Sequence, residues 1–115
     1  MRRRIIAFGT YYHDFLATLN PKESRKIKYI ISLLETTDRM PVKFIRHIKE
    51  HGNLYELLME YESNIYRLFF IFDEDSIVVL FHGFQKKTQK TPKKEIEKAI
   101  RLRSEYYEQK RTSNL

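Results

Sequence analysis

Three consecutive β-type runs in the middle of the chain constrain its fold more than any other feature. They span Leu54 to Tyr61, Ile65 to Phe72 and Ile77 to Phe84, and they are rich in Tyr, Phe, Ile and Val, which strands favour. Only Glu62-Ser63-Asn64 and Asp73-Glu74-Asp75-Ser76 separate them, which leaves room for tight turns. We therefore expect a three-stranded meander at the centre of the fold.

The third run has no polar residue from Ile77 to Phe81. A strand of this kind is typically covered on both faces, so we expect it in the interior of the sheet. A shorter β-prone segment near the N-terminus, Arg3 to Phe8, is expected to join the same sheet.

Helical patterns lie on both sides of the meander. Before it, one pattern opens at Gly9-Thr10, and Asn20-Pro21-Lys22-Glu23 then combines an Asn cap, a Pro at the first helical position and the Glu of a capping box. These features predict two helices in a short antiparallel hairpin, the second ending near Thr36-Thr37-Asp38. The expected core residues of this pair are Tyr12, Phe15, Leu16, Leu19, Ile27, Ile30, Ile31 and Leu34.

After the meander, Thr91-Pro92 predicts the start of a third helix. Its expected core residues are Ile96, Ala99, Ile100 and Tyr107. The chain beyond Gln109 is polar, so we expect one domain over residues 1–110 and a frayed tail over residues 111–115. The fold class is α+β in the order β-α-α-β-β-β-α, with a small twisted sheet dominated by antiparallel pairs, an N-terminal helical hairpin and a C-terminal helix.

The composition of this 115-residue chain limits the cellular compartments in which we expect it. It has no cysteine, so neither disulfides nor cysteine-bound zinc can stabilise it, which fits a reducing compartment. Arg2-Arg3-Arg4 is followed by only four apolar residues, too few for a signal peptide. No segment approaches the roughly 18 apolar residues that span a bilayer. We expect a cytoplasmic protein that does not enter the membrane.

Positive charge is concentrated near the C-terminus. Residues 85–115 hold ten Lys and Arg against four Asp and Glu, whereas residues 1–84 hold twelve against eleven. Most of the formal charge of +7 therefore comes from about a quarter of the chain. Clustered cations attract polyanions more strongly than evenly spread ones, which indicates a surface that faces a nucleic acid.

The element order and the basic junction between the last strand and the last helix resemble the RelE/HigB family of toxins. The likeness lies in Leu54 to Leu57, in Asn64 to Phe70 and above all in Leu80 to Ile96, and it is greatest to the phage-derived HigB-like branch. The resemblance implies a RelE/ParE-like fold and metal-independent, ribosome-dependent cleavage of messenger RNA without a cofactor. It also implies a HigA-like antitoxin with a helix-turn-helix part, and contact with DNA only through that antitoxin.

Arg67 is the first candidate site residue, because its strand is otherwise made of Tyr, Leu, Phe and Ile. A half-buried guanidinium needs an anionic partner. One interpretation is a cross-strand pair with Glu60 or Glu56, and the other is a phosphate of bound RNA. The family likeness, which includes an arginine at this place, favours the phosphate.

Lys86 and Lys87 are the next candidates, with Lys90, Lys93 and Lys94 as RNA or ribosome contacts. These lysines are either a solvated turn or a phosphate-binding surface. Lys90, Lys93 and Lys94 crowd the expected start of the third helix, where the helix dipole disfavours cations. A local rule broken in this way often marks function. Crowding of like charges can also lower the pKa of a lysine enough for proton transfer.

His82 is a further candidate, either as a general acid or base or as a packed histidine. The four histidines are not spaced like a metal site, and Asp73-Glu74-Asp75 is more economically a turn, so we expect no metal. The first meander strand has Glu56, Leu58 and Glu60 where relatives often carry basic residues. Glu56 is therefore either a catalytic base or a partner that holds Arg67.

Two other functions are compatible with the expected fold or with the positive charge. A ParE-like protein would poison DNA gyrase through protein contacts and leave RNA uncut. A non-catalytic basic module would bind nucleic acid with a steep salt dependence and leave messages intact.

Overall fold

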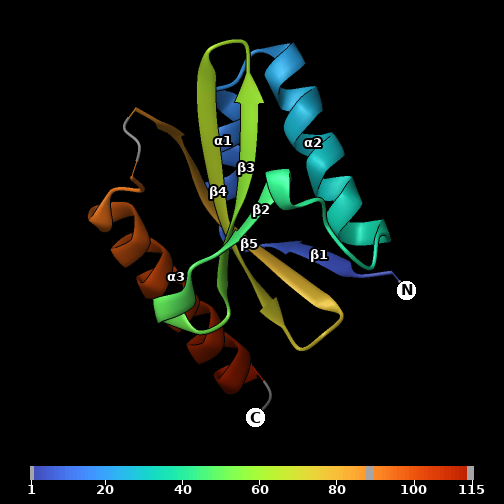
Figure 1. Cartoon of the computed structure of the whole chain (residues 1–115). Coiled ribbons are helices and arrows are strands. Elements are labelled where there is room, and N and C mark those ends of the chain that lie inside the picture. The colour runs from blue at the N-terminus through green and yellow to red at the C-terminus, as the bar shows by residue number, and fades with distance from the viewer. Residues whose placement is uncertain (1, 88–89, 114–115) are drawn as a thin grey trace.

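The computed structural model describes residues 2–87 and 90–113, which form an α+β fold with a five-stranded mixed sheet and three α-helices (Figure 1). The strand order is β1-β5-β4-β3-β2. The strands are β1 (Arg4–Ala7), β2 (Ile45–His47), β3 (Leu54–Tyr61), β4 (Asn64–Asp73) and β5 (Ile77–Lys86). The helices are α1 (Tyr11–Ala17), α2 (Pro21–Thr36) and α3 (Lys93–Ser113), and 3-10 turns span Val42–Phe44 and Lys49–His51.

The predicted meander is confirmed, since β3 pairs antiparallel with β4 and β4 with β5. The prediction that the N-terminal segment joins this sheet is also confirmed, because β1 pairs parallel with β5. β5 therefore lies between two strands, with Val78 in the core on one face and Val79 in the core on the other. β2 was not predicted, because three residues are too few to show a strand period.

The capping box predicted for α2 is confirmed. The Asn20 side chain accepts a hydrogen bond from the Glu23 backbone N–H at 2.8 Å, and the Glu23 carboxylate accepts one from the Asn20 backbone N–H at 3.0 Å. Pro21 occupies the first turn. The antiparallel hairpin of α1 and α2 stays a prediction. Within the described part of the chain, no helix is long and apolar enough to cross a membrane.

The hydrophobic core has two layers, one on each face of the sheet. Residues of α1 and α2 pack with Leu57 and Leu68 on one face, and residues of α3 pack with Phe69 and Phe81 on the other. The prediction of Tyr107 as a core residue of α3 is wrong, because its side chain is 36% exposed. The fully buried positions of α3 are Ala99 and Leu102, and Tyr106 packs against them. The helix continues as far as Ser113.

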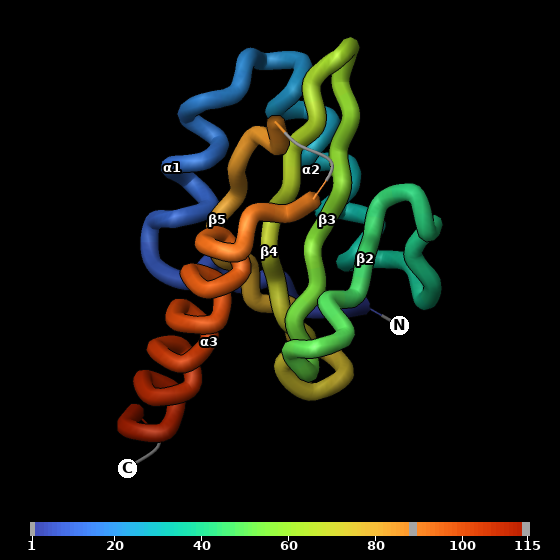
Figure 2. The backbone as a smooth tube through the Cα atoms, turned by 60° about the vertical axis from the view of Figure 1, so that its left-hand side comes forward, coloured from blue at the N-terminus to red at the C-terminus, as the bar shows by residue number. Residues whose placement is uncertain are grey.

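A β-bulge in β5 decides which side chains share a face. Leu68 pairs with Gly83 and Phe70 with Leu80, so Phe69 alone stands opposite both Phe81 and His82. From the bulge onward, the even-numbered residues of β5 point to the face that α3 covers. Figure 2 shows that the β3–β4 hairpin extends well past the start of α3, so this face is only partly covered by the helix.

Candidate functional site

Arg67 lies on the part of this face beyond the helix. It pairs with Leu58 of β3 and Phe84 of β5, two residues nearer the hairpin turn than the buried Phe69. The side chain is half-buried, and its Nε is covered without a hydrogen-bond partner among the described residues. Burial lowers the pKa of Arg67 from its ordinary value, and the negative charge of Glu56 opposes this shift. Arg67 thus has a buried donor that no described residue satisfies.

Glu56 is fully buried at the centre of the site. Its carboxylate lies 3.6 Å from Nε of Arg46, the residue opposite it on β2. The Thr91 hydroxyl donates to the same carboxylate at 3.2 and 3.3 Å, which ties the segment before α3 to the sheet. None of the described ion pairs joins Arg67 to Glu56 or Glu60, although the charges of both carboxylates act to raise its pKa. The choice between a cross-strand pair and a bound phosphate stays a prediction.

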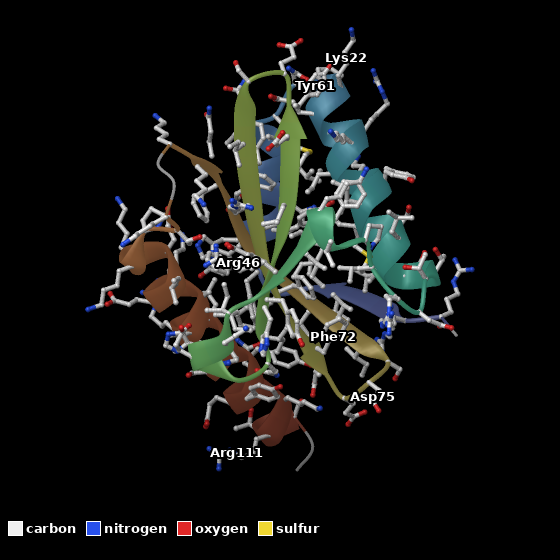
Figure 3. All side chains as sticks on the ribbon, viewed as in Figure 1. Lys22, Arg46, Tyr61, Phe72, Asp75 and Arg111 are labelled. Carbon is white, nitrogen blue, oxygen red and sulfur yellow. The ribbon has the colours of Figure 1, made fainter. Side chains whose placement is uncertain are left out.

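Lys86 completes the site from β5. It is 8% exposed and stands opposite Ile65, diagonal to Arg67 on the same face. Burial and then the charge of Arg67 lower the pKa of Lys86 from its ordinary value, Glu56 raises it and Arg46 lowers it again. We call Arg46, Glu56, Arg67 and Lys86 the cationic cluster, in which three cations surround one carboxylate (Figure 3 labels Arg46).

The structure separates Lys87 from its neighbour Lys86. Lys87 follows the end of β5, is exposed and lines a pocket on the other side of the strand. The like charges that lower the pKa of Lys86 are therefore those of Arg67 and Arg46 and not those of the expected lysine neighbours. Lys90, Lys93 and Lys94 are exposed, and Lys93 lies 3.9 Å from Glu97 one turn along α3. Residues 88 and 89 of the lysine-rich segment lie outside the described residues.

His82 also lies apart from the cationic cluster. It is 4% exposed, and its ring packs against Phe69 and Phe84, with ring centres 5.2 and 6.3 Å away. Nε2 is 3.3 Å from the Glu95 carboxylate, without hydrogen-bond geometry. Burial, followed by the charges of Lys98 and Arg101, lowers the pKa of His82 to about 4. The imidazole is therefore neutral at neutral pH.

Sequence reasoning missed two residues of the site, Arg46 and Thr91. Arg46 belongs to the three-residue strand β2, and its alignment with Glu56 depends on strand pairing that has no local signal. Thr91 was noticed only as a helix-start residue, although its side chain contacts a strand 35 positions earlier in the chain. The available signal in the sequence was Glu56, an acid on a strand where basic residues were expected. It indicated a buried anionic partner for the cations of the site.

Two comparisons with known proteins bear on this site. A family model described as phage derived protein Gp49-like (DUF891) matches residues 14–104. The match runs from α1 into α3 and includes every residue of the cationic cluster. No curated protein matches the chain in sequence.

Proposed function

Since the chain belongs to the phage-derived Gp49-like family, a RelE-like toxin family of toxin–antitoxin systems, we propose that it is a toxin that cuts messenger RNA on the ribosome. In this proposal the chain is of the HigB-like branch and folds as RelE/ParE-like toxins do. A HigA-like antitoxin with a helix-turn-helix part neutralises it. Catalysis needs no metal or cofactor.

The observation that carries this proposal is the excess of positive charge in the cationic cluster. Glu56 offsets one of three cations, and the guanidinium of Arg67 keeps a donor without a protein partner among the described residues. A phosphodiester supplies the anionic oxygens that such donors bind. The cluster lies on the part of the sheet that extends past the start of α3 (Figure 2).

The proposed reaction is attack of a ribose 2′-oxygen on the adjacent phosphorus. The new bond is O2′–P, the bond that breaks is P–O5′, and the products are a 2′,3′-cyclic phosphate and a 5′-hydroxyl. Arg67 and Arg46 stabilise the charge that builds on the phosphate oxygens. Lys86, whose pKa is lowered by burial and by Arg67, takes the proton from the 2′-hydroxyl. A further acid, or water, protonates the departing 5′-oxygen.

Glu56 acts as a positioning residue in this scheme. Its carboxylate is already engaged by Arg46 and Thr91 and lies at the centre of the cluster without exposure to solvent. It holds Arg46 of β2 on one side and the segment before α3 on the other. The alternative role of Glu56, that of a general base, would require its carboxylate to reach a ribose hydroxyl.

The test is primer-extension mapping of a defined messenger in a reconstituted translation reaction. Wild-type protein is expected to make discrete cuts that need ribosomes. Arg67→Ala is expected to reduce the cleavage rate by about 100-fold or more, as loss of one transition-state donor does, and Lys86→Met to reduce it similarly. Arg111→Ala, at the far end of α3 (Figure 3), is the matched control and is expected to cut normally.

The same assay separates the other functions and the two roles of Glu56. Intact message with folded wild-type protein contradicts the nuclease. DNA damage without RNA cleavage would then indicate gyrase inhibition, and neither effect would indicate a basic binding module. Glu56→Gln keeps an acceptor for Thr91, so a positioning role predicts substantial residual cleavage, whereas a base role predicts none.

A further inference from the structure

A pocket lies on the other side of the end of β5 from the cationic cluster. It has a volume of about 600 Å³ and is formed by α1, the end of β5 and the first half of α3. Its lining includes Tyr11, His82, Phe84, Lys87 and Lys98. The proposed reaction gives no role to this pocket.

The pocket combines an aromatic platform with cations. Tyr11 packs against Phe8, with ring centres 6.5 Å apart, which holds the tyrosine ring in place. The Lys98 ammonium lies 5.5 Å from the centre of the Tyr11 ring. A long lysine side chain over an aromatic face can turn away onto an anion and leave the ring to a planar ligand. Lys87 supplies a second cation at the same pocket.

His82 is an independent sign of a ligand. It borders the pocket, is 4% exposed, and neither ring nitrogen has a hydrogen-bond partner among the described residues. Buried polar atoms without partners are rare in native proteins and call for an explanation such as a bound group. The charged groups around the ring are Glu95, Lys98 and Arg101.

The pocket and the cationic cluster are adjacent. Phe84 lines the pocket and is also the cross-strand neighbour of Arg67. At these two residues the backbones of β4 and β5 are only about 4.8 Å apart, the usual spacing of paired strands. We propose that the pocket holds a nucleobase of single-stranded RNA, stacked on Tyr11, next to the phosphate bound by the cationic cluster. Lys87 and Lys98 then contact the flanking phosphate. The identity of the ligand as RNA rests on the proposed function.

Direct binding without ribosomes tests this inference. A short single-stranded RNA carrying one 2-aminopurine is titrated with wild type, with Tyr11→Leu and with the control Tyr29→Leu, which changes an exposed tyrosine on α2. Stacking on an aromatic side chain predicts quenching of the 2-aminopurine by wild type. It also predicts about tenfold weaker binding by Tyr11→Leu, which corresponds to about 1.4 kcal/mol, and no change for Tyr29→Leu.

An abasic nucleotide at the same position provides the second arm. Removal of the base is expected to weaken binding to wild type about tenfold and to leave binding to Tyr11→Leu almost unchanged. If Tyr11→Leu does not fold, Lys98→Met replaces it, with an expected affinity loss of at least about threefold and a weaker salt dependence.

Failure of this inference differs from failure of the proposed function. Equal RNA affinity of wild type and Tyr11→Leu, or no quenching, overturns the nucleobase pocket even if ribosome-dependent cleavage is intact. Unchanged RNA affinity combined with weakened antitoxin binding by Tyr11→Leu would overturn it in favour of a protein contact. Quenching and affinity loss without ribosomal cleavage would support the pocket and contradict the nuclease.

Discussion

At the scale of single residues, Lys86 is the most informative, because it is a cation placed where solvation is poor. The side chain is 8% exposed and faces Arg67. Both conditions disfavour the charged form, so its pKa lies below the ordinary 10.5. Such a residue lowers the stability of the protein at neutral pH, because the native fold disfavours its charged form.

Lys86→Met is expected to raise the free energy of unfolding at pH 7 by about 1 kcal/mol, because it removes a poorly solvated charge and keeps the volume. The unfolded chain keeps the lysine proton up to about pH 10.5 and the native protein loses it earlier, so wild type gains stability as pH rises through this window. The advantage of the variant should therefore shrink toward pH 10.5. Urea denaturation at several pH values measures it.

Lys87→Met is the matched control, because the neighbouring side chain is exposed. It should change the free energy of unfolding little at any pH. A pH-independent difference between wild type and Lys86→Met, or equal behaviour of the two lysine variants, would contradict the account of Lys86.

The sequence predicted part of this site. Arg67 was identified because a charged residue in an apolar strand needs a partner, and the requirement follows from composition alone. The choice between Lys86 and Lys87 was not predictable, because simple alternation from Val79 and Phe81 would put Lys87 on the face covered by α3. The bulge at Phe81 and His82 shifts the alternation by one residue and brings Lys86 beside Arg67 instead.

At the scale of elements, α1 packs against β5. This strand contributes Lys86 to the cationic cluster and His82 and Phe84 to the pocket. A Cβ at Gly83 would lie 2.5 Å from the ring of Phe15, so this close approach needs a glycine. The meander and the capping box of α2 could be predicted because their signals are local. β2 and the bulge could not, because both depend on partners far away in the chain.

Gly83→Ala is expected to lower the free energy of unfolding by about 1–3 kcal/mol through overpacking against Phe15. Phe15→Leu makes room at the same contact, so the double variant Phe15→Leu/Gly83→Ala should be more stable than the sum of the two single effects predicts. Urea denaturation of the four proteins measures the coupling. Strict additivity would contradict the direct contact between α1 and β5.

At the scale of the whole molecule, the formal charge of +7 is distributed unevenly in space as well as in sequence. Arg46 and Arg67 come from the first 84 residues and join Lys86 in one cluster, so the site draws on both the balanced and the basic part of the chain. Two acids of α3 pair with a base one turn away, Glu97 with Lys93 and Glu105 with Arg101. The cationic cluster is therefore assembled by folding and not by the basic segment alone.

This distribution predicts how RNA affinity responds to salt. For single strands the logarithm of the binding constant falls with the logarithm of salt concentration by about 0.7 per phosphate contacted. Lys87→Gln should therefore reduce the slope by about 0.7, because Lys87 is exposed and lines the pocket. Lys22→Gln, at the start of α2 (Figure 3), is the matched control and should leave the slope unchanged. Fluorescence anisotropy over a range of salt concentrations measures both slopes. Equal reductions from the two variants would mean that the protein attracts RNA through its total charge and not through a defined surface.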